Sequence, residues 1–179
     1  MWYNGENAER DRKMEDKYIF RKAAPREVTA VFDLIMSRVA WMDRVGIQQW
    51  NMTKYDECYP LAYYEMRRQK DELFVLEEAS TGKLACVGAL FHEDERWPDK
   101  EAAYYLHHLA ADLDFKGAGS IFLQLAERYT ADQGMQYLRL DSAVDNPVLA
   151  QYYTSRGYRE AGRCIDGLYE GILRQKKLS

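Results

Sequence analysis

Residues 104–131, YYLHHLAADLDFKGAGSIFLQLAERYTA, decide the fold because they join an apolar strand, a glycine-bearing turn and an amphipathic helix. Gly117 and Gly119 let the backbone turn sharply and approach a ligand closely. Ser120 is placed to help cap the following helix, whose first N–H groups have no intrahelical partners. Free N–H donors at the positive end of a helix dipole suit a phosphate. The stretch therefore predicts an anion site, although a turn with two glycines is a weak signal by itself.

Length and composition indicate a single compact domain. The chain has 179 residues, of which 47% are hydrophobic, which is enough for one full core. The net charge is −4, and 25 Lys and Arg against 29 Asp and Glu argue against a nucleic-acid partner. The sequence leaves the oligomeric state open, and a homodimer is the commonest assembly among soluble proteins.

The cysteines and the hydropathy pattern bear on the compartment. Cys58, Cys86 and Cys164 are widely spaced and form no CxxC or Cys/His grouping, so we expect a reducing compartment and no metal site. No apolar run is long enough for a membrane span, and the first residues lack the apolar segment of a signal peptide. The expectation is a cytoplasmic protein that makes no membrane contact.

The order of predicted elements follows from hydrophobic periodicity and from the glycine, proline and capping residues that begin or end helices and strands. Residues 1–13 are polar and aperiodic and are predicted to be a disordered extension, with Met14 as an alternative start, so that residues 14–179 form the single domain. Strands are expected at 18–22, 73–78, 84–92, 102–111, 135–141, 158–162 and 167–175. Helices are expected from Pro25 to Gly46, over 55–69, after Gly117, and from Asn146 to about Arg156.

This order, β, α, α, β, β, β, α, β, α, β, β, resembles the GCN5-related N-acetyltransferase (GNAT) superfamily. The resemblance covers about residues 18–178, and its best segments are LHHLAADLDFKGAG at 106–119 and LRLDSAVDNPVLAQYYTSRGY at 138–158. In the second segment, Asn146, Tyr153 and Gly157 fall at the spacing of the family's DNPxAxxLYxxxGF pattern. The resemblance implies an α/β (α+β) fold: a mixed, mostly antiparallel sheet of six to seven strands, splayed between strands 4 and 5 and flanked by about four helices.

The family's phosphate motif is Gln or Arg, two residues, Gly, one residue, then Gly or Ala, and two alignments are open. In one, Lys116 is the basic residue and Gly119 the first glycine, which leaves Ile121 at the last position. In the other, Gly117 and Gly119 are the two glycines and Asp114 replaces the basic residue. We favour the first, because it keeps a cation near the phosphates. Both place the pyrophosphate at residues 117–120.

The resemblance implies an acetyl-CoA-dependent N-acetyltransferase in which a primary amine attacks acetyl-CoA directly within a ternary complex, with no metal. The pantetheine arm is expected between the fourth and fifth strands, and an N–H near Leu109 or Ala110 is expected to polarise the thioester oxygen. Tyr153 matches the family's acid for the leaving thiolate, with adjacent Tyr152 as a competitor, and Asn146 matches a cofactor contact that is equally suited to capping a helix. The expected cofactor contacts are Leu109, Ala110, Ala111, Lys116, Gly117, Ala118, Gly119, Ser120, Asn146 and Tyr153.

An arriving ammonium must also lose a proton, so a base is required. His107 and His108 lie on the key strand, and in a regular strand their side chains point to opposite faces, so that only one reaches the substrate. His107 is the chosen candidate, ahead of Glu101, Asp112 and Asp141.

The acceptor is the least determined part of the prediction. The resemblance places it between the first helices and the last hairpin, where acidic residues suit a cationic small-molecule amine. A protein or peptide amine is the competing acceptor, and a non-catalytic acyl-CoA sensor is the competing function. The expected contacts are Trp41, Gln49 and Trp50, with Asp43, Gln48 and Tyr169 as further candidates.

Overall fold

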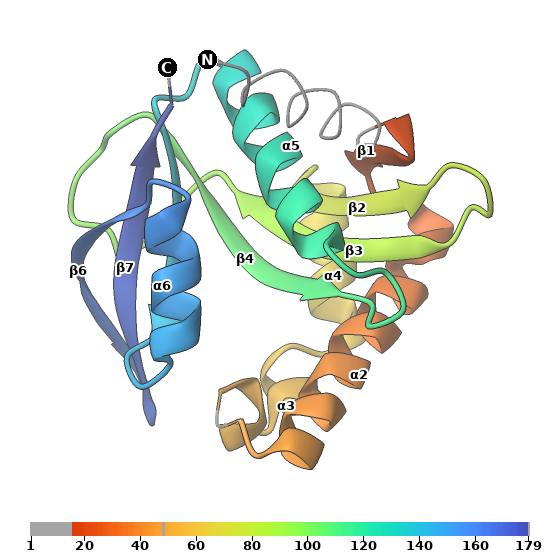
Figure 1. The fold of residues 1–179 in the computed structure, drawn as a ribbon, viewed down its shortest axis with the longest axis horizontal. Helices are drawn as coiled ribbons and strands as arrows, with labels where there is room; N and C mark the ends of the chain where they lie inside the picture. Colours follow the sequence, from red (N-terminus) through yellow and green to blue (C-terminus); the bar gives the residue numbers. More distant parts are fainter. Residues whose placement is uncertain (1–15, 48, 179) are drawn as a thin grey trace, which may run out of the picture.

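The computed structural model describes residues 16–47 and 49–178, and these form a seven-stranded sheet that runs through the molecule (Figure 1). The strands are β1 (Tyr18–Lys22), β2 (Leu73–Glu78), β3 (Leu84–Phe91), β4 (Ala103–Ala111), β5 (Tyr137–Ala143), β6 (Arg159–Asp166) and β7 (Tyr169–Lys177). Their order is β1-β2-β3-β4-β5-β7-β6, and every neighbouring pair is antiparallel except β4 and β5. The mixed, mostly antiparallel sheet is confirmed. The predicted disorder of residues 1–13, and Gln48, lie outside the described residues.

Helices cover both faces of this sheet. They are α2 (Val28–Val45), α3 (Tyr55–Cys58), α4 (Leu61–Gln69), α5 (Ala118–Asp132) and α6 (Pro147–Ser155), with short 3-10 turns η1 (Pro25–Glu27) and η2 (Trp50–Met52). Figure 1 shows α5 and α6 on one face and α2 and α4 on the other. The described part thus has five α-helices rather than about four, because the piece expected over 55–69 breaks at Pro60, which disfavours helix at the residue before it. None of the helices in this part is long and apolar enough to cross a bilayer.

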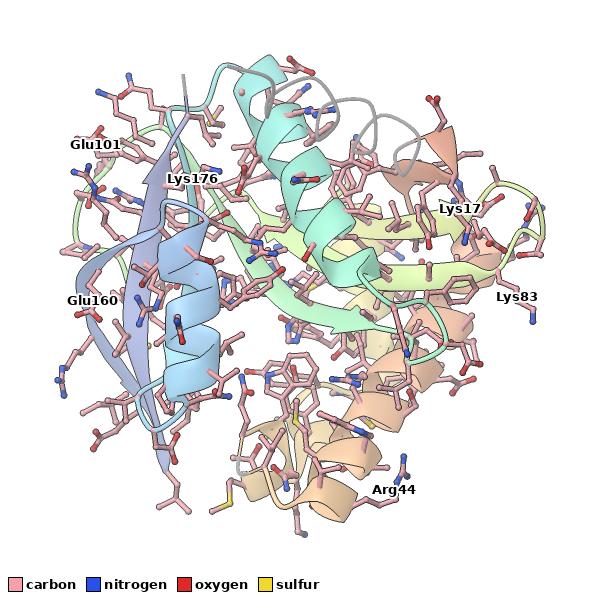
Figure 2. All side chains as sticks on the ribbon, in the orientation of Figure 1. Lys17, Arg44, Lys83, Glu101, Glu160 and Lys176 are labelled. Atoms are coloured by element: carbon pink, nitrogen blue, oxygen red, sulfur yellow. The ribbon has the colours of Figure 1, made fainter. Side chains whose placement is uncertain are left out.

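Two hydrophobic cores result from this layering. In β2, Leu73 and Val75 pack with the α2 and α4 side, whereas Phe74 and Leu76 pack with α5. Because both faces are covered, the central strands are apolar at nearly every position instead of alternating. Charged side chains such as Arg44, Lys83, Glu101 and Glu160 point outward (Figure 2).

The sheet opens between β4 and β5, as expected. The two strands pair only over Ala103–Tyr105 with Tyr137–Arg139, while β5 continues to pair with β7 as far as Ala143. From Leu106 onward, β4 has no register partner on β5. The half of β4 nearer α5 therefore presents backbone groups to a gap.

A β-bulge in β4 changes the direction of one predicted side chain. The register with β3 shifts between Val87 and Ala89, and His108 on the opposite strand has a φ of 54°. The alternation of side chains is broken there, so both His107 and His108 contact Phe91, with ring centroids 4.2 and 6.0 Å away. The expectation that the two histidine side chains point to opposite faces was wrong, because both line the same cavity.

The C-terminal hairpin is longer than the sequence suggested. Gly162 sits within β6 at a bulge rather than at the strand's end, and the chain turns at Gly167, whose φ is 58°. The tip of this hairpin, with Asp166, reaches the cavity described next.

Candidate active site

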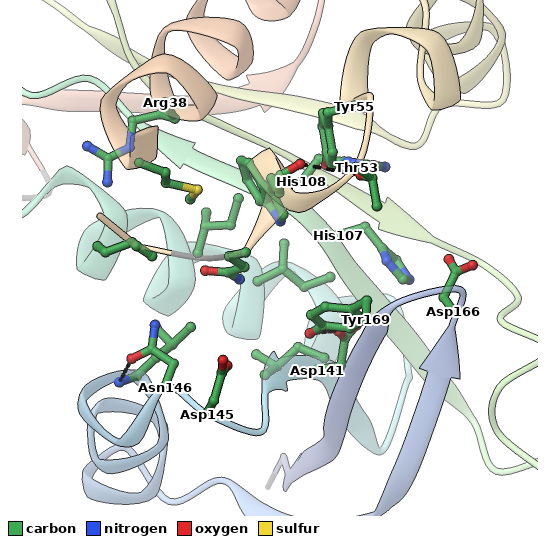
Figure 3. Close-up of a pocket in the computed structure, with 18 of the residues that line it drawn as sticks. Arg38, Thr53, Tyr55, His107, His108, Asp141, Asp145, Asn146, Asp166 and Tyr169 are labelled. Carbon is green, nitrogen blue, oxygen red and sulfur yellow. Dashed lines mark hydrogen bonds between the residues drawn. The ribbon is translucent and has the colours of Figure 1, made fainter. Parts of the chain in front are cut away.

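A cavity of about 970 Å³ opens at the gap between β4 and β5 (Figure 3). Its α6 side is formed by Leu109, Ala111, Gly119, Asn146, Tyr152 and Tyr153. Its α3 side is formed by Trp41, Gln49, Trp50, Tyr55, Tyr59, Arg96, His107, Asp166 and Tyr169. Residues far apart in the chain, from Trp41 to Tyr169, thus meet in one space, and many of the predicted site residues are among them.

The N-terminus of α5 supplies donors to the α6 side. Gly117 is the N-cap with a φ of 84°, a conformation that favours glycine, and no side chain in the described part of the chain caps the helix. Within the described residues, no hydrogen bond takes up the N–H groups of Lys116, Gly117 or Gly119. A Cβ on Gly119 would lie 3.7 Å from Ala111, an ordinary contact, so glycine there keeps space rather than relieving a clash.

These positions bear on the two motif alignments. Ile121, the last motif position of the favoured alignment, is buried in the core and cannot face a phosphate. Gly117 and Gly119 both have local reasons to be glycine, which supports the second alignment. Lys116 is exposed and, like Gly117 and Ser120, lies beside the cavity lining rather than in it, while the side chains of Ala110 and Ala118 are buried in the cores.

Ser120 does not cap the helix as expected. Its hydroxyl lies 3.0 Å from that of Tyr152 and accepts a hydrogen bond of 2.9 Å from Arg156. The Arg156 guanidinium also lies 3.6 Å from the centroid of the Tyr152 ring. Tyr152 is therefore held against the start of α5, which leaves the neighbouring Tyr153 as the tyrosine whose hydroxyl is uncommitted.

Helix α6 positions Asn146 and Tyr153. Asn146 caps the helix by accepting a 3.0 Å bond from the Leu149 N–H, and it also lines the cavity, so the capping role is confirmed. Tyr153 is 6% exposed, and its hydroxyl has no hydrogen-bond partner within the described part of the chain. Burial raises the pKa of the Tyr153 phenol, so this group is protonated at neutral pH.

Aromatic rings form much of the α3 side. Trp50 stacks on Tyr55 with centroids 5.1 Å apart, and Tyr55 contacts Tyr59 at 4.8 Å. Trp41 is covered by the Arg38 guanidinium at 4.0 Å. The predicted contacts Trp41, Gln49 and Trp50 all line the cavity, whereas Asp43 lies outside the lining and accepts a bond from Asn51.

A charged network closes the floor beneath these rings. Arg96, from the β3–β4 loop, pairs with Asp94 at 2.7 Å and with Asp141 at 2.9 Å. The Tyr169 hydroxyl donates to Asp141 at 2.6 Å, and His107 Nε2 lies 3.1 Å from Asp94. The network joins one loop and three strands, which fixes the lower wall of the cavity.

The pKa values of this network follow from its pairing. Burial alone would raise the pKa of Asp94, but hydrogen bonds from His107 and Arg96 outweigh burial and hold it below its usual range. Burial would lower the pKa of Arg96, and Asp94 and Asp141 together raise it instead. Arg96 Nη2 also lies 3.3 and 3.2 Å from the two ring nitrogens of His107, so both nitrogens have protein partners.

The other base candidates separate clearly. Asp141 lines the cavity within the network, whereas Glu101 and Asp112 lie outside the lining, and Glu101 points outward (Figure 2). Sequence reasoning missed Asp94, Arg96 and Tyr55. Arg96 lies in the segment EDERWPDK, which carries no periodic signal, and its role depends on strands far apart in sequence. Within the described ranges, no group of three or more His, Cys, Asp or Glu side chains is arranged to hold a metal ion.

Comparison with known proteins places this site in a family. A model of the acetyltransferase (GNAT) family matches residues 39–158, which is more than half of the chain. The chain therefore belongs to the GNAT family. Members of this family are acetyltransferases, so the cavity between β4 and β5 is the candidate active site of one.

Solved structures agree on the fold. The chain is similar to a GNAT-family acetyltransferase from Listeria monocytogenes, with 25% identity, coverage of 90% of this chain and 95% of that chain, and a TM-score of 0.75. It is also similar to a GNAT-family acetyltransferase from Streptococcus agalactiae, with 22% identity, coverage of 90% of this chain and 96% of that chain, and a TM-score of 0.71. A chain of the NatC complex bound to Gag peptide and CoA shares only the fold, with 10% identity, coverage of 91% of this chain and 99% of that chain, and a TM-score of 0.66. Comparison with curated protein sequences gave no match.

Proposed function

We propose that the protein transfers the acetyl group of acetyl-CoA to the primary amine of a small, cationic molecule by direct attack within a ternary complex. The observation that carries the proposal is the opening of β4 from β5 into a cavity. Gly119, at the start of α5 and beside the other free donors of that helix, lines this cavity, as does Tyr153 with its buried ring. Acetyl-CoA supplies the activated acetyl thioester. The chain's residues must bind it, orient it and manage the protons.

The α6 side fits the cofactor. The N–H groups of Lys116, Gly117 and Gly119 suit the pyrophosphate at the positive end of α5. The N–H of Asp112 bonds Ala85 on the β3 side, and because successive N–H groups along a strand alternate in direction, that of Ala111 points into the gap. The unpaired edge of β4, Leu109 included, is thus free to bond an extended pantetheine arm, and Asn146 lies at the same wall.

Tyr153 suits the role of leaving-group acid. Its raised pKa keeps the phenol protonated, and its hydroxyl is free to approach the sulfur at the end of the pantetheine arm. On the opposite strand side, His107 is the candidate base, oriented by Asp94. Because Arg96 and Asp94 lie against both of its nitrogens, the acceptor amine must displace a protein partner to use it.

The α3 side supports a cationic acceptor. Asp145 and Asp166 line the cavity, and neither carboxylate has an ion-pair partner within the described residues. The rings of Trp50 and Tyr55 offer apolar and cation-π contacts beside them.

Calorimetric titration with acetyl-CoA, followed by thiol release against a panel of amines and peptides, tests the proposal. Saturable one-to-one binding with thiol release to a small cationic amine is the expected result. Release only to peptides would replace the acceptor class, and binding without any release would favour an acyl-CoA sensor. No binding by the folded protein would contradict the proposal as a whole.

A further inference from the structure

His108 is a buried histidine with a tyrosine hydroxyl at each ring nitrogen. Tyr55 Oη lies 2.6 Å from Nδ1, and Tyr63 Oη lies 3.0 Å from Nε2. A neutral imidazole has one donor and one acceptor nitrogen, so one tyrosine donates to the ring and the other accepts from it. The three side chains thus form an unbroken chain of hydrogen bonds in either tautomer.

This chain of hydrogen bonds connects two cavities. Tyr55 lines the main cavity, and Tyr63 lines a second cavity of about 780 Å³ bordered by α4 and the β3–β4 loop. Figure 3 shows Tyr55 and His108 together on the α3 side, above His107. A path for protons between the two spaces therefore exists without any movement of the backbone.

The surroundings of His108 keep the ring neutral. Burial lowers its pKa well below the usual range, and the nearby His107, Arg67 and Arg96 act in the same direction. The groups that face the ring are Tyr55 from α3, Tyr59 from the loop after it, Tyr63, Tyr64 and Arg67 from α4, Phe91 from β3, His107 from β4 and Arg96 from the β3–β4 loop. Among the residues that the structure describes, no carboxylate faces the ring. A ring in this setting is suited to passing a proton on rather than to holding one.

We propose that Tyr55, His108 and Tyr63 form a proton relay that carries the proton of the acceptor's ammonium from the main cavity to the second cavity. The inference rests on the N-acetyltransferase function proposed above. In it, Tyr55 contacts the acceptor, while His108 and Tyr63 act through Tyr55. The relay removes the need for His107 to give up its contacts with Asp94 and Arg96.

Each group in the relay gives up one proton for each proton that it accepts. The ammonium N–H bond breaks as its proton joins Tyr55 Oη, and the original Tyr55 proton moves to His108 Nδ1. The Nε2 proton moves to Tyr63 Oη, whose own proton passes to water in the second cavity. One proton has left the amine, both tyrosines are again neutral, and His108 is left as its other neutral tautomer, with the proton on Nδ1. Because His108 also lines the second cavity, proton exchange with water there returns the ring to the starting tautomer.

The Tyr63→Phe variant tests the relay, because it removes the exit hydroxyl without touching the main cavity. We expect kcat/KM for thiol release to fall about tenfold at pH values well below the pKa of the acceptor amine. Near the pKa of that amine, the variant and the parent protein should converge, because the acceptor then arrives already neutral. The Kd for acetyl-CoA should not change.

Tyr64→Phe is the matched control. The Tyr64 ring lies 5.4 Å from that of His108, but its buried hydroxyl has no hydrogen-bond partner within the described residues, and it lines neither cavity. This variant should keep the pH profile of the parent protein.

Three results would overturn the relay. An equal loss at every pH in Tyr63→Phe would mean a structural role. The pH profile of kcat/KM could instead be unchanged in Tyr63→Phe, while His107→Asn loses activity at pH values well below the pKa of the acceptor amine. That result would assign the base to His107. Absence of thiol release by the parent protein with any amine would overturn the proposed function and the relay with it, an outcome that is distinguishable from the first two.

Discussion

The α6 side and the α3 side of the cavity are built in different ways. The α6 side is built on regular elements: backbone groups at the edge of β4 and the first turn of α5, and side chains of helix α6 and its cap. The α3 side consists of side chains from loops and hairpins that meet only in the folded protein, such as Arg96 and Tyr169. Backbone donors suit the constant part of a reaction, and assembled side chains suit the part that varies between enzymes.

The largest expected effect concerns Tyr153, the buried tyrosine on the α6 side. Tyr153→Phe removes only a hydroxyl from a buried ring, so the fold and the Kd for acetyl-CoA should be preserved. Turnover in thiol release should fall about 100-fold, because the thiolate would leave without its acid. Tyr152→Phe, which breaks a contact with Ser120, serves for comparison. A larger loss in Tyr152→Phe than in Tyr153→Phe would reassign the acid.

The next effect concerns the network on the α3 side. Asp94→Asn removes a carboxylate that Arg96 and His107 both contact, and we expect a loss of about 2 kcal/mol in the free energy of unfolding at pH 7. Because folding lowers the pKa of Asp94, its charge stabilises the fold above the unfolded pKa of about 3.9, and this contribution is lost as the pH falls below that value.

Urea titrations from pH 7 down to pH 3 measure this difference. The difference in free energy of unfolding between Asp94→Asn and the parent protein should become smaller below about pH 4. Glu95 is exposed in the same loop, so Glu95→Gln should have the same free energy of unfolding as the parent protein across this pH range. If the difference in free energy of unfolding between Asp94→Asn and the parent protein stays constant to pH 3, the charge of the carboxylate is not what stabilises the loop.

The α6 side has its own test in Gly119→Val. Because the fold has room for a Cβ there, the variant should fold, while its branched side chain occupies space at the free donors of α5. We expect the Kd for acetyl-CoA to rise about tenfold, equivalent to about 1.4 kcal/mol, by calorimetry. Gly119→Ala should show a smaller rise. Equal affinity in the valine variant would move the phosphate site elsewhere.

The same contrast explains what the sequence could predict. The β4–α5 turn, the cap at Asn146 and the positions of the strands along the chain depend on residues close together in sequence, so local rules found them. The β-bulge that turns His108 toward the cavity depends on the register with β3, which local alternation cannot reveal. No local sequence pattern identified Arg96 as a site residue either, because it joins Asp94 and Asp141, which lie on opposite sides of the β4–β5 gap.

The smallest expected effect would sharpen the assignment of the α3 side to the acceptor. Asp166 lies at the exposed tip of the β6–β7 hairpin and borders both cavities, with no ion-pair partner within the described residues. Asp166→Asn should raise KM for a cationic amine about threefold, and less at high salt, because an exposed charge contributes under about 1 kcal/mol. Glu170→Gln, exposed on the same hairpin but outside both cavities, should leave KM unchanged. If both variants change KM equally, the hairpin acts through its overall charge, and the acceptor has no specific contact with Asp166.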